Sequence, residues 1–315
     1  MTIRKPRSPK TMADQSPRQC CKNERGVVLI SVLAVTAVIA AIAWQMVSRQ
    51  SLVVASASGA NFTLQSQEYL IAAEQYARQL IVEDWQDEAS RLFDSEKEAW
   101  AATRAPFEIP GGTIEMRVWD MQSKFNINAA DTQPEAFQAL LNSFQIPTGI
   151  ASEWADWIDE DQESRTPGGE DMELLLQVPA LRSANALAAD ASEVRFLPAM
   201  LDAYNAEFAE LLVALPSINL ELNINTVEAE LLEALGFESA VAEAIVSGDR
   251  SYENIEDVDM LEAGEGSAYF VTTSRFFAVW AQVEIDSSRA RMESYLYRNP
   301  KDGNVRLIGR NFESV

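Results

Sequence analysis

The first strong pattern along the chain is an uncharged apolar run from Val27 to Trp44. Its 18 residues are enough to cross a membrane as a helix, and the apolar character continues to Val47, just before Arg49. Basic residues precede the run, which favours a cytoplasmic amino terminus with the rest of the chain across the membrane. The sequence therefore predicts a transmembrane segment over residues 27–47.

A helical pattern continues beyond this run. In "ANFTLQSQEYLIAAEQYARQLIVEDW" apolar residues recur at spacings of three and four, or near them, as on one face of a helix. No proline occurs between Val27 and Ala105. We expect one long helix from about residue 28 to about residue 85, with Gly59 as its weakest point.

Strand patterns flank a helix-rich middle region. In "IPGGTIEMRVWDM" a Gly-Gly turn precedes alternating apolar positions, which predicts a strand. Residues 129–264 are acidic, helix-rich and broken by prolines. Three alternating runs follow in "SRFFAVWAQVEIDSSRARMESYLYRNPKDGNVRLIGRN", separated by turns at 286–288 and 301–303. The pattern predicts an α+β fold: a long amino-terminal helix on an antiparallel sheet, with a large all-α domain inserted after the first strand.

The middle region contains one short motif twice. Asn126-Ile127-Asn128 and Asn223-Ile224-Asn225 each lead into a helix, and Asn is a good helix cap. Two ordinary capped helices would explain this, but the repetition suggests two related helical units, at about 129–200 and 216–264. The second, "TVEAELLEALGFESAVAEAIVSG", looks like a SAM-like or helix-hairpin-helix domain. Many such hairpins bind DNA, yet residues 216–264 hold one basic and twelve acidic residues, which argues against phosphate binding.

Composition narrows the functional classes further. The net charge is −23, although residues 1–26 hold seven basic and only two acidic residues, so the body of the chain is strongly acidic and disfavours nucleic acid. The chain has no histidine, and its two cysteines are Cys20 and Cys21, both before the apolar run. These absences remove the commonest catalytic groups, and we expect no enzymatic activity. An anchored calcium-dependent hydrolase is the alternative from that class.

An acidic segment in the middle region has the spacing of a calcium loop. Four carboxylates fall at positions 1, 3, 5 and 12 of a twelve-residue window: Asp159, Asp161, Glu163 and Glu170. Position 6 is Ser164 where an EF-hand has glycine, so the loop is not a standard one. Asp171 and Glu160 are further candidate ligands. A solvated acidic loop without metal is the alternative.

The leader and these motifs together resemble a known family. The quoted pieces are "WDMQSKFNINAA", "WADWIDEDQE", "PGGED", "ASEVRFLPAM" and "INLELNINTVEAELLEAL", with Arg25-Gly26 before the apolar run and the strands at the end. In this combination and order they resemble the minor pseudopilin K family of type II secretion systems, also called general secretion pathway protein K, over nearly all of residues 22–312. Most pilins and pseudopilins have glutamate at the fifth mature position. Here it is Ser31, and the K type is the minor pseudopilin that lacks this glutamate.

The resemblance implies processing and organisation. Prepilin peptidase would cut between Gly26 and Val27, and Val27 would be N-methylated. The expected parts are a leader (1–26), a transmembrane helix (27–47), a periplasmic helix with the first strand of a pilin-like core (48–128), the inserted helical domain (129–264) and the last core strands (265–315). The protein would cross the bacterial inner membrane once, with its amino terminus cytoplasmic and its head periplasmic.

The resemblance also implies partners and a cofactor. The partners would be the I-type and J-type minor pseudopilins in a tip complex, other pseudopilins, prepilin peptidase and the inner-membrane assembly platform, with no nucleic acid. The tip complex would start or cap a pseudopilus that exports folded proteins across the outer membrane. Structural Ca²⁺ would bind in the helical domain, with Asp159, Asp161, Glu163, Glu170 and Asp171 as candidate ligands. A type IV pilus-like minor pilin and a membrane-anchored helix-hairpin-helix DNA-binding protein are the alternatives.

Overall fold

The computed structural model describes residues 24–166, 168–176, 178–201, 203–258 and 268–314. The chain divides into two compact units, residues 1–61 and residues 62–315. One helix, α1 (Glu24–Gln86), supplies residues to both units and is not interrupted at Gly59. The prediction of a single long helix over about 28–85 is therefore confirmed.

In the first unit the apolar side chains of α1 are exposed. Val27, Val38 and Trp44 are 66%, 58% and 76% exposed. Among the described residues, α1 is the one helix long and apolar enough to cross a membrane, judged by length and composition. Since a continuous exposed apolar surface is unfavourable in water, α1 is a candidate membrane anchor. A signal sequence near an amino terminus has the same properties.

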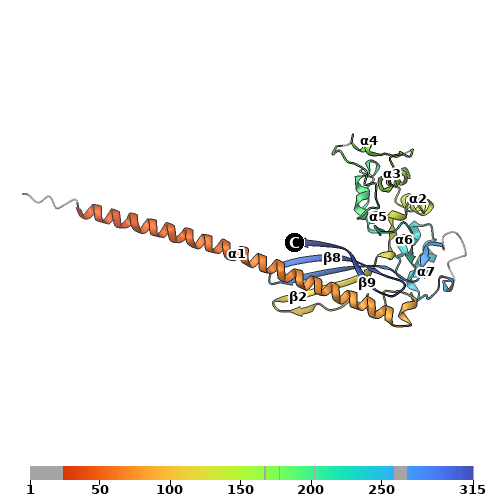
Figure 1. Cartoon of the computed structure of the whole chain (residues 1–315), viewed down its shortest axis with the longest axis horizontal. Coiled ribbons are helices and arrows are strands. Elements are labelled where there is room, and N and C mark those ends of the chain that lie inside the picture. The colour runs from red at the N-terminus through yellow and green to blue at the C-terminus, as the bar shows by residue number, and fades with distance from the viewer. Residues whose placement is uncertain (1–23, 167, 177, 202, 259–267, 315) are drawn as a thin grey trace, which may run out of the picture. The chain divides into compact units, whose positions relative to one another are not determined.

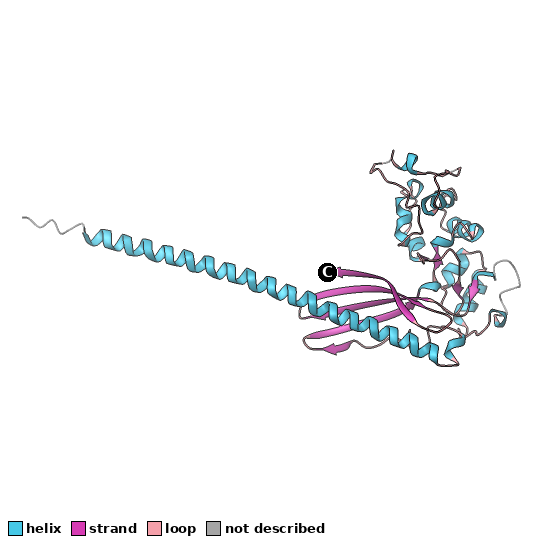
Figure 2. Ribbon diagram, viewed as in Figure 1, coloured by secondary structure: helices cyan, strands magenta, loops and turns pink. Residues whose placement is uncertain are grey.

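The second unit is built on a five-stranded antiparallel sheet, shown in Figures 1 and 2. The strands, in their order across the sheet, are β1 (Phe107–Ile109), β2 (Gly112–Asp120), β7 (Phe276–Ile285), β8 (Ser288–Arg298) and β9 (Val305–Ser314). The turns predicted at 286–288 and 301–303 separate the last three strands, so this part of the prediction is confirmed.

The carboxyl-terminal part of α1 packs on one face of this sheet. Its buried residues are spaced three or four apart along most of one stripe, as the sequence pattern predicts: Leu70, Ala73, Ala77, Leu80 and Ile81. They meet alternate residues of the strands, among them Met116, Phe277 and Val279. Trp100, from the segment between α1 and β1, packs edge-on against Phe277 with ring centroids 5.1 Å apart.

A buried charge fixes α1 to the last two strands. Glu74 of α1 is 1% exposed and accepts a hydrogen bond from the Ser294 hydroxyl of β8 at 2.7 Å. Its two carboxylate oxygens also accept hydrogen bonds from the Arg310 guanidinium of β9, at 2.8 and 2.7 Å. Because this bidentate pair needs one relative position of helix and strands, it fixes the helix on the sheet.

The turn before β9 depends on glycine. Gly303 has φ +67°, a conformation that side-chain-bearing residues rarely adopt. A Cβ atom there would lie 2.3 Å from the ring of Trp85, near the end of α1. The turn can therefore close over the helix end only with glycine at this position.

The inserted region leaves the sheet after β2 and returns at β7. Its α-helices are α2 (Pro134–Ser143), α3 (Ile150–Ile158), α4 (Asp171–Leu174), α5 (Ala206–Glu210), α6 (Ala229–Ala234) and α7 (Ser239–Ser247). Short 3₁₀ helices connect them, at Met121–Ser123, Ile127–Ala129, Ala191–Phe196, Pro198–Met200 and Ile255–Asp257; another, Ser90–Leu92, follows α1. The insert is mainly helical, as predicted.

The insert also contains four short strands, β3 to β6, which the prediction of an all-α domain did not include. β3 (Phe125–Asn126) pairs in parallel with β4 (Leu212–Val213), and β5 (Leu222–Asn223) pairs in parallel with β6 (Phe270–Val271). Each pair starts at one of the two Asn-Ile-Asn motifs and closes a separate segment of the insert. The structural insert therefore spans residues 121–275, and the expected limits at 129 and 264 lie inside it.

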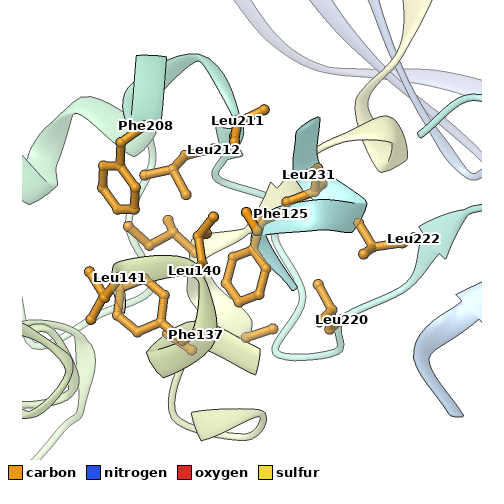
Figure 3. Close-up of a cluster of buried hydrophobic side chains, with 14 of the residues drawn as sticks. Phe125, Phe137, Leu140, Leu141, Phe208, Leu211, Leu212, Leu220, Leu222 and Leu231 are labelled. Atoms are coloured by element: carbon orange, nitrogen blue, oxygen red, sulfur yellow. The ribbon is translucent and has the colours of Figure 1, made fainter. Parts of the chain in front are cut away.

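One hydrophobic core joins described residues from both segments of the insert, 125–213 and 222–271. Figure 3 shows its centre, where Phe125 stacks on Phe137 with ring centroids 5.7 Å apart. The same cluster includes Phe208 from the first segment of the insert, which β3 and β4 close, and Leu222 and Leu231 from the second segment, which β5 and β6 close. Since both segments share this core, we expect the insert to fold as a unit rather than as two independent domains.

The asparagines of both motifs are buried and bond to backbone groups of distant loops. The Asn128 amide group donates to the carbonyls of Ala188 and Leu215, at 3.0 and 2.8 Å. Asn225 donates to the Tyr252 carbonyl at 3.0 Å and accepts from the Tyr252 amide at 2.9 Å. The repeated motif thus serves to satisfy loop backbone inside the core.

Candidate functional site

The acidic loop after α3 is organised around a buried carboxylate. Asp156, in the last turn of α3, is fully buried. Its Oδ2 atom accepts hydrogen bonds from the backbone amides of Arg165 and Gly169, both at 3.0 Å. A Cβ atom on Gly168 would lie 2.2 Å from the same oxygen. The loop therefore wraps closely around Asp156, and glycine at position 168 makes the close approach possible.

Three carboxylates of this loop lie close enough together to hold a metal ion. One oxygen from each of Asp156, Asp159 and Glu170 lies within 4.8 Å of the others. The Arg165 guanidinium bonds to Asp156 at 2.9 Å and also to Asp159, so it already offsets part of their charge. Burial raises the pKa of the Glu170 carboxyl, and the neighbouring carboxylates raise it further. A hydrogen bond from Ser183 opposes this shift.

The structure places the sequence-predicted ligands in two groups. Asp159 and Glu170 are in the cluster, whereas Asp161, Glu163 and Asp171 are not. Asp161 accepts a hydrogen bond from the backbone amide of Glu163 at 2.7 Å, in a local turn, and both residues are exposed. Asp171 accepts bonds from the amide and hydroxyl of Ser183, at 3.1 and 3.2 Å. Calcium binding by this set stays a prediction.

Sequence reasoning missed Asp156. It lies three residues before Asp159 and between two tryptophans in "WADWIDE", on a helix whose residues from Trp154 to Ile158 are all buried. A charged residue inside such a buried run is unusual and was the available signal. The twelve-residue spacing begins at Asp159 and therefore could not include it.

The helical hairpin that resembles DNA-binding domains presents acidic side chains. Helices α6 and α7 flank a turn in which Gly236 has φ +101°. Glu233 of α6 accepts a hydrogen bond from the Ser239 hydroxyl of α7 at 2.6 Å. The nearby Arg250 bonds to the Val227 carbonyl, and its side chain is only 12% exposed. A phosphate backbone would meet carboxylates here, which disfavours a nucleic-acid interface.

The predicted processing position lies at the start of α1. Residues 1–23 of the expected leader lie outside the described residues, and α1 begins at Glu24. Ser31, at the fifth position after Gly26, donates its hydroxyl to the Val28 carbonyl of the same helix at 2.9 Å. Cleavage between Gly26 and Val27 stays a prediction.

Comparisons with known proteins support the resemblance. A family model described as "Type II secretion system (T2SS), protein K" matches residues 123–217. Type II secretion system protein K of Pseudomonas aeruginosa is 29% identical, over 92% of this chain and 93% of that protein. The protein K of Aeromonas hydrophila is 25% identical, over 92% and 97% of the two chains.

A solved structure has the same fold. A chain from the crystal structure of the GspK-GspI-GspJ complex of the enterotoxigenic Escherichia coli type 2 secretion system superposes with a TM-score of 0.70. The match covers 81% of this chain and 98% of that one, at 21% identity. The family model, the relatives aligned over most of their length and the solved structure all match this chain to type II secretion system protein K, in sequence and in fold.

Proposed function

We propose that this chain is the minor pseudopilin that joins I-type and J-type minor pseudopilins at the tip of the type II secretion pseudopilus. The observation that carries this is one helix, α1, whose first part is exposed and apolar while its last part packs on a sheet. The protein K relatives extend over nearly all of both parts. The solved chain with the same fold comes from a complex of a K, an I and a J component.

The mechanism in this proposal is assembly rather than catalysis. Residues 27–47 hold the chain in the inner membrane, with the amino terminus in the cytoplasm and the sheet and insert in the periplasm. The insert at residues 121–275 is too bulky to admit a further subunit above it, so the chain caps the filament. Ser31 fits this position, because a subunit with no neighbour above it has no amine to pair with a glutamate.

The test is the intact mass and amino-terminal sequence of the membrane-extracted chain, from cells with and without prepilin peptidase. We expect a chain starting at Val27 with a methylated amine only when the peptidase is present, and both cysteines absent from it. A Gly26→Val chain should keep its leader. Gly59→Ala is the matched control, since a Cβ there meets nothing within 4 Å, and it should be processed normally.

Two other results would contradict the proposal. A chain that retains Met1 in both strains would be a plain signal anchor. A chain that starts near Ser58 would be an ordinary secreted protein. A plain signal anchor would lack the new amino terminus at Val27, and an ordinary secreted protein would lack the retained apolar helix. Assembly into a pseudopilus depends on both.

We further infer that the acidic loop holds a structural Ca²⁺, as the sequence spacing predicts. Asp156, Asp159 and Glu170 supply converging carboxylate oxygens, the ligand type that Ca²⁺ prefers. An ion bound only by the folded state stabilises it by about 2.7 kcal/mol at a concentration 100 times the Kd. Affinities of about 10⁻⁴–10⁻³ M are typical of calcium modules outside the cytoplasm.

Substitutions separate the clustered ligands from the exposed ones. We expect Glu170→Gln to reduce the rise in melting temperature that millimolar CaCl₂ gives to the full chain. Glu163→Gln, in the same loop but exposed and outside the cluster, is the matched control and should keep the full rise. If Glu163→Gln and Asp161→Asn remove the effect while Glu170→Gln keeps it, the ion lies elsewhere in the loop.

A further inference from the structure

A second group of carboxylates lies outside the insert, at the carboxyl-terminal end of α1. Asp84 belongs to α1, and Asp94 and Glu98 come from the segment between α1 and β1. One carboxylate oxygen from each lies within 4.8 Å of one from each of the others. Asp84 and Asp94 are 7% and 0% exposed, and Glu98 is half-buried. We call these three residues the helix-end cluster.

The helix-end cluster holds more negative charge than its surroundings neutralise. Arg298, at the end of β8, forms ion pairs with Asp84 at 3.2 Å and with Asp94. Among the described residues it is the cation that pairs with the cluster, and a fourth carboxylate, the buried Asp120, adds repulsion at Asp94. Two buried carboxylates, one half-buried carboxylate and one guanidinium leave two negative charges unbalanced when all are ionised, which is costly away from water.

Two oxygens of the cluster also lack a hydrogen-bond donor. The Oδ1 atom of Asp94 and the Oε1 atom of Glu98 are buried and accept no hydrogen bond from any residue that the structure describes. The other oxygen of each of these two carboxylates accepts a hydrogen bond. Asp94 Oδ2 accepts from the Ser274 amide at 2.6 Å, and Glu98 Oε2 accepts from the Trp100 indole at 3.0 Å. Since buried acceptors are nearly always satisfied, two unpartnered oxygens in one carboxylate cluster indicate a missing cationic partner.

We propose that Asp84, Asp94 and Glu98 bind a divalent cation of the Ca²⁺ class. Two positive charges together with Arg298 balance the three carboxylates. Calcium takes six to eight oxygen ligands at about 2.3–2.6 Å in flexible geometry, so three carboxylates leave places for water. Water can reach the ion from the side of Glu98, which is half-buried, whereas Asp94 is closed off.

An ion at this position would join the end of the long helix to the base of the insert. The backbone amide of Asp94 donates to the Thr272 carbonyl at 2.8 Å, just before β7. Its carbonyl accepts from the Asn223 amide group of β5 at 2.9 Å. The segment that carries two of the ligands is thus bonded to both ends of the second insert segment. Binding would tighten the junction between α1, the sheet and the insert.

A proton is the rival occupant. The Asp84 and Glu98 carboxyl groups lie within hydrogen-bond reach of each other, so one shared proton would also reduce the repulsion. Burial raises the pKa of Asp84 to about 8, and the nearby Glu98 and Asp94 add to the shift. A proton satisfies one pair of oxygens, however, and leaves Asp94 Oδ1 without a partner. The experiment must therefore distinguish cation binding from protonation.

The experiment counts bound calcium on the full chain in detergent. After removal of metals, the chain is dialysed against CaCl₂ at pH 7.5, and bound calcium is measured by mass spectrometry. We expect Glu98→Gln to bind one ion fewer than the unsubstituted chain. Glu96→Gln is the matched control, because Glu96 lies two residues away with a side chain that is 65% exposed, and it should bind the full number. Asp159→Asn, in the acidic loop, is measured alongside so that the two sites are counted separately.

A second measurement covers the case in which Glu98→Gln does not fold. Tb³⁺ replaces Ca²⁺ at oxygen sites, and excitation of Trp100, whose indole nitrogen lies 3.0 Å from Glu98 Oε2, would sensitise its emission. With the helix-end cluster intact and Asp159→Asn present, we expect saturable emission that excess Ca²⁺ abolishes. Equal calcium counts in Glu98→Gln and Glu96→Gln would overturn the proposal. A second result would also overturn the proposal: the stability of the Asp159→Asn chain rises on acidification but does not respond to calcium. A proton would then occupy the helix-end cluster.

Discussion

Replacing Asp120 with alanine is expected to cost the second unit about 2–6 kcal/mol of unfolding free energy. Asp120 is the last residue of β2 and is 2% exposed. Its Oδ2 atom accepts hydrogen bonds from the Thr226 hydroxyl at 2.6 Å, the Asn223 amide group at 2.9 Å and the Ser274 hydroxyl. Its Oδ1 atom accepts from the backbone amide of Gln122 at 2.8 Å.

The size of this effect follows from the number of donors that lose their acceptor. Each buried donor left unsatisfied costs about 1–3 kcal/mol. Alanine would remove the acceptor of the Gln122 amide and of the Ser274 hydroxyl and would leave a cavity. Thr226 would keep only its 3.4 Å bond to the Asn223 carbonyl, and Asn223 would keep its bond to the Asp94 carbonyl. The donors come from three separate parts of the insert, at residues 122, 223–226 and 274, so relaxation of one loop cannot satisfy them all. Since most domains are stable by only about 5–15 kcal/mol, the junction should open well before the remaining sheet unfolds.

Urea unfolding of the full chain in detergent measures the effect. Glu115→Ala is the matched control on the same strand and should change stability by less than about 0.5 kcal/mol. Asp120→Asn should lie between the two, because it keeps one oxygen acceptor. Burial raises the pKa of Asp120, and the hydrogen bonds from Ser274 and Thr226 oppose that shift. Equal midpoints for Asp120→Ala and Glu115→Ala would show that the buried network does not hold the junction.

The parts of the fold that the sequence predicts are those with long periodic patterns. The stripe from Leu70 to Ile81 repeats often enough to identify a helix face, and the alternation in β2, β7 and β8 identifies the buried face of the sheet. Strands β3 to β6 have two residues each, and two residues cannot show alternation. Their pairing depends on distant partners and on buried asparagines that bond to loop backbone.

The acidic loop was only partly predictable for a related reason. A linear ligand spacing finds Asp159 and Glu170, which are separated by a fixed length of loop. It cannot find Asp156, because that residue joins the cluster through the helical turn before the loop. The helix-end cluster is less accessible still, since nothing in the sequence indicates that Arg298 faces Asp84. Contacts between residues far apart along the chain follow from the packing of the sheet, not from local pattern.

Replacing residues 121–275 with a short Gly-containing hairpin is expected to keep the helix-and-sheet core folded and to abolish tip function. Asp120 and Phe277 already face each other across the antiparallel β2–β7 ladder, so a tight turn can join the strand ends. The core beneath α1 includes Leu70, Trp100 and Phe277 but none of the described residues of the deleted region. The insert has a separate hydrophobic core, so removal of the insert leaves the core beneath α1 intact.

The deletion does have a cost on the other side of the sheet. Phe276 and Ala278 pack against Met121 and Leu215, and both of these partners are lost. Asp120 loses its hydrogen-bond donors but becomes exposed to water, so it no longer carries a burial penalty. We therefore expect a less stable core that still unfolds in one transition, with Trp100 buried in the folded state, as its near-ultraviolet circular dichroism would show.

A secretion assay on the same shortened chain tests the role of the insert separately from that of the core. In cells that lack the native chain, the shortened chain should enter the membrane and be processed, since α1 is unchanged, yet secretion of folded proteins should fall to the background level. The full chain with Glu163→Gln is the control and should restore secretion. A shortened chain that folds and also restores secretion would show that the insert does not cap the filament. A shortened chain found along the filament shaft would support the proposal, because removal of the bulky insert then allows another subunit to assemble above it.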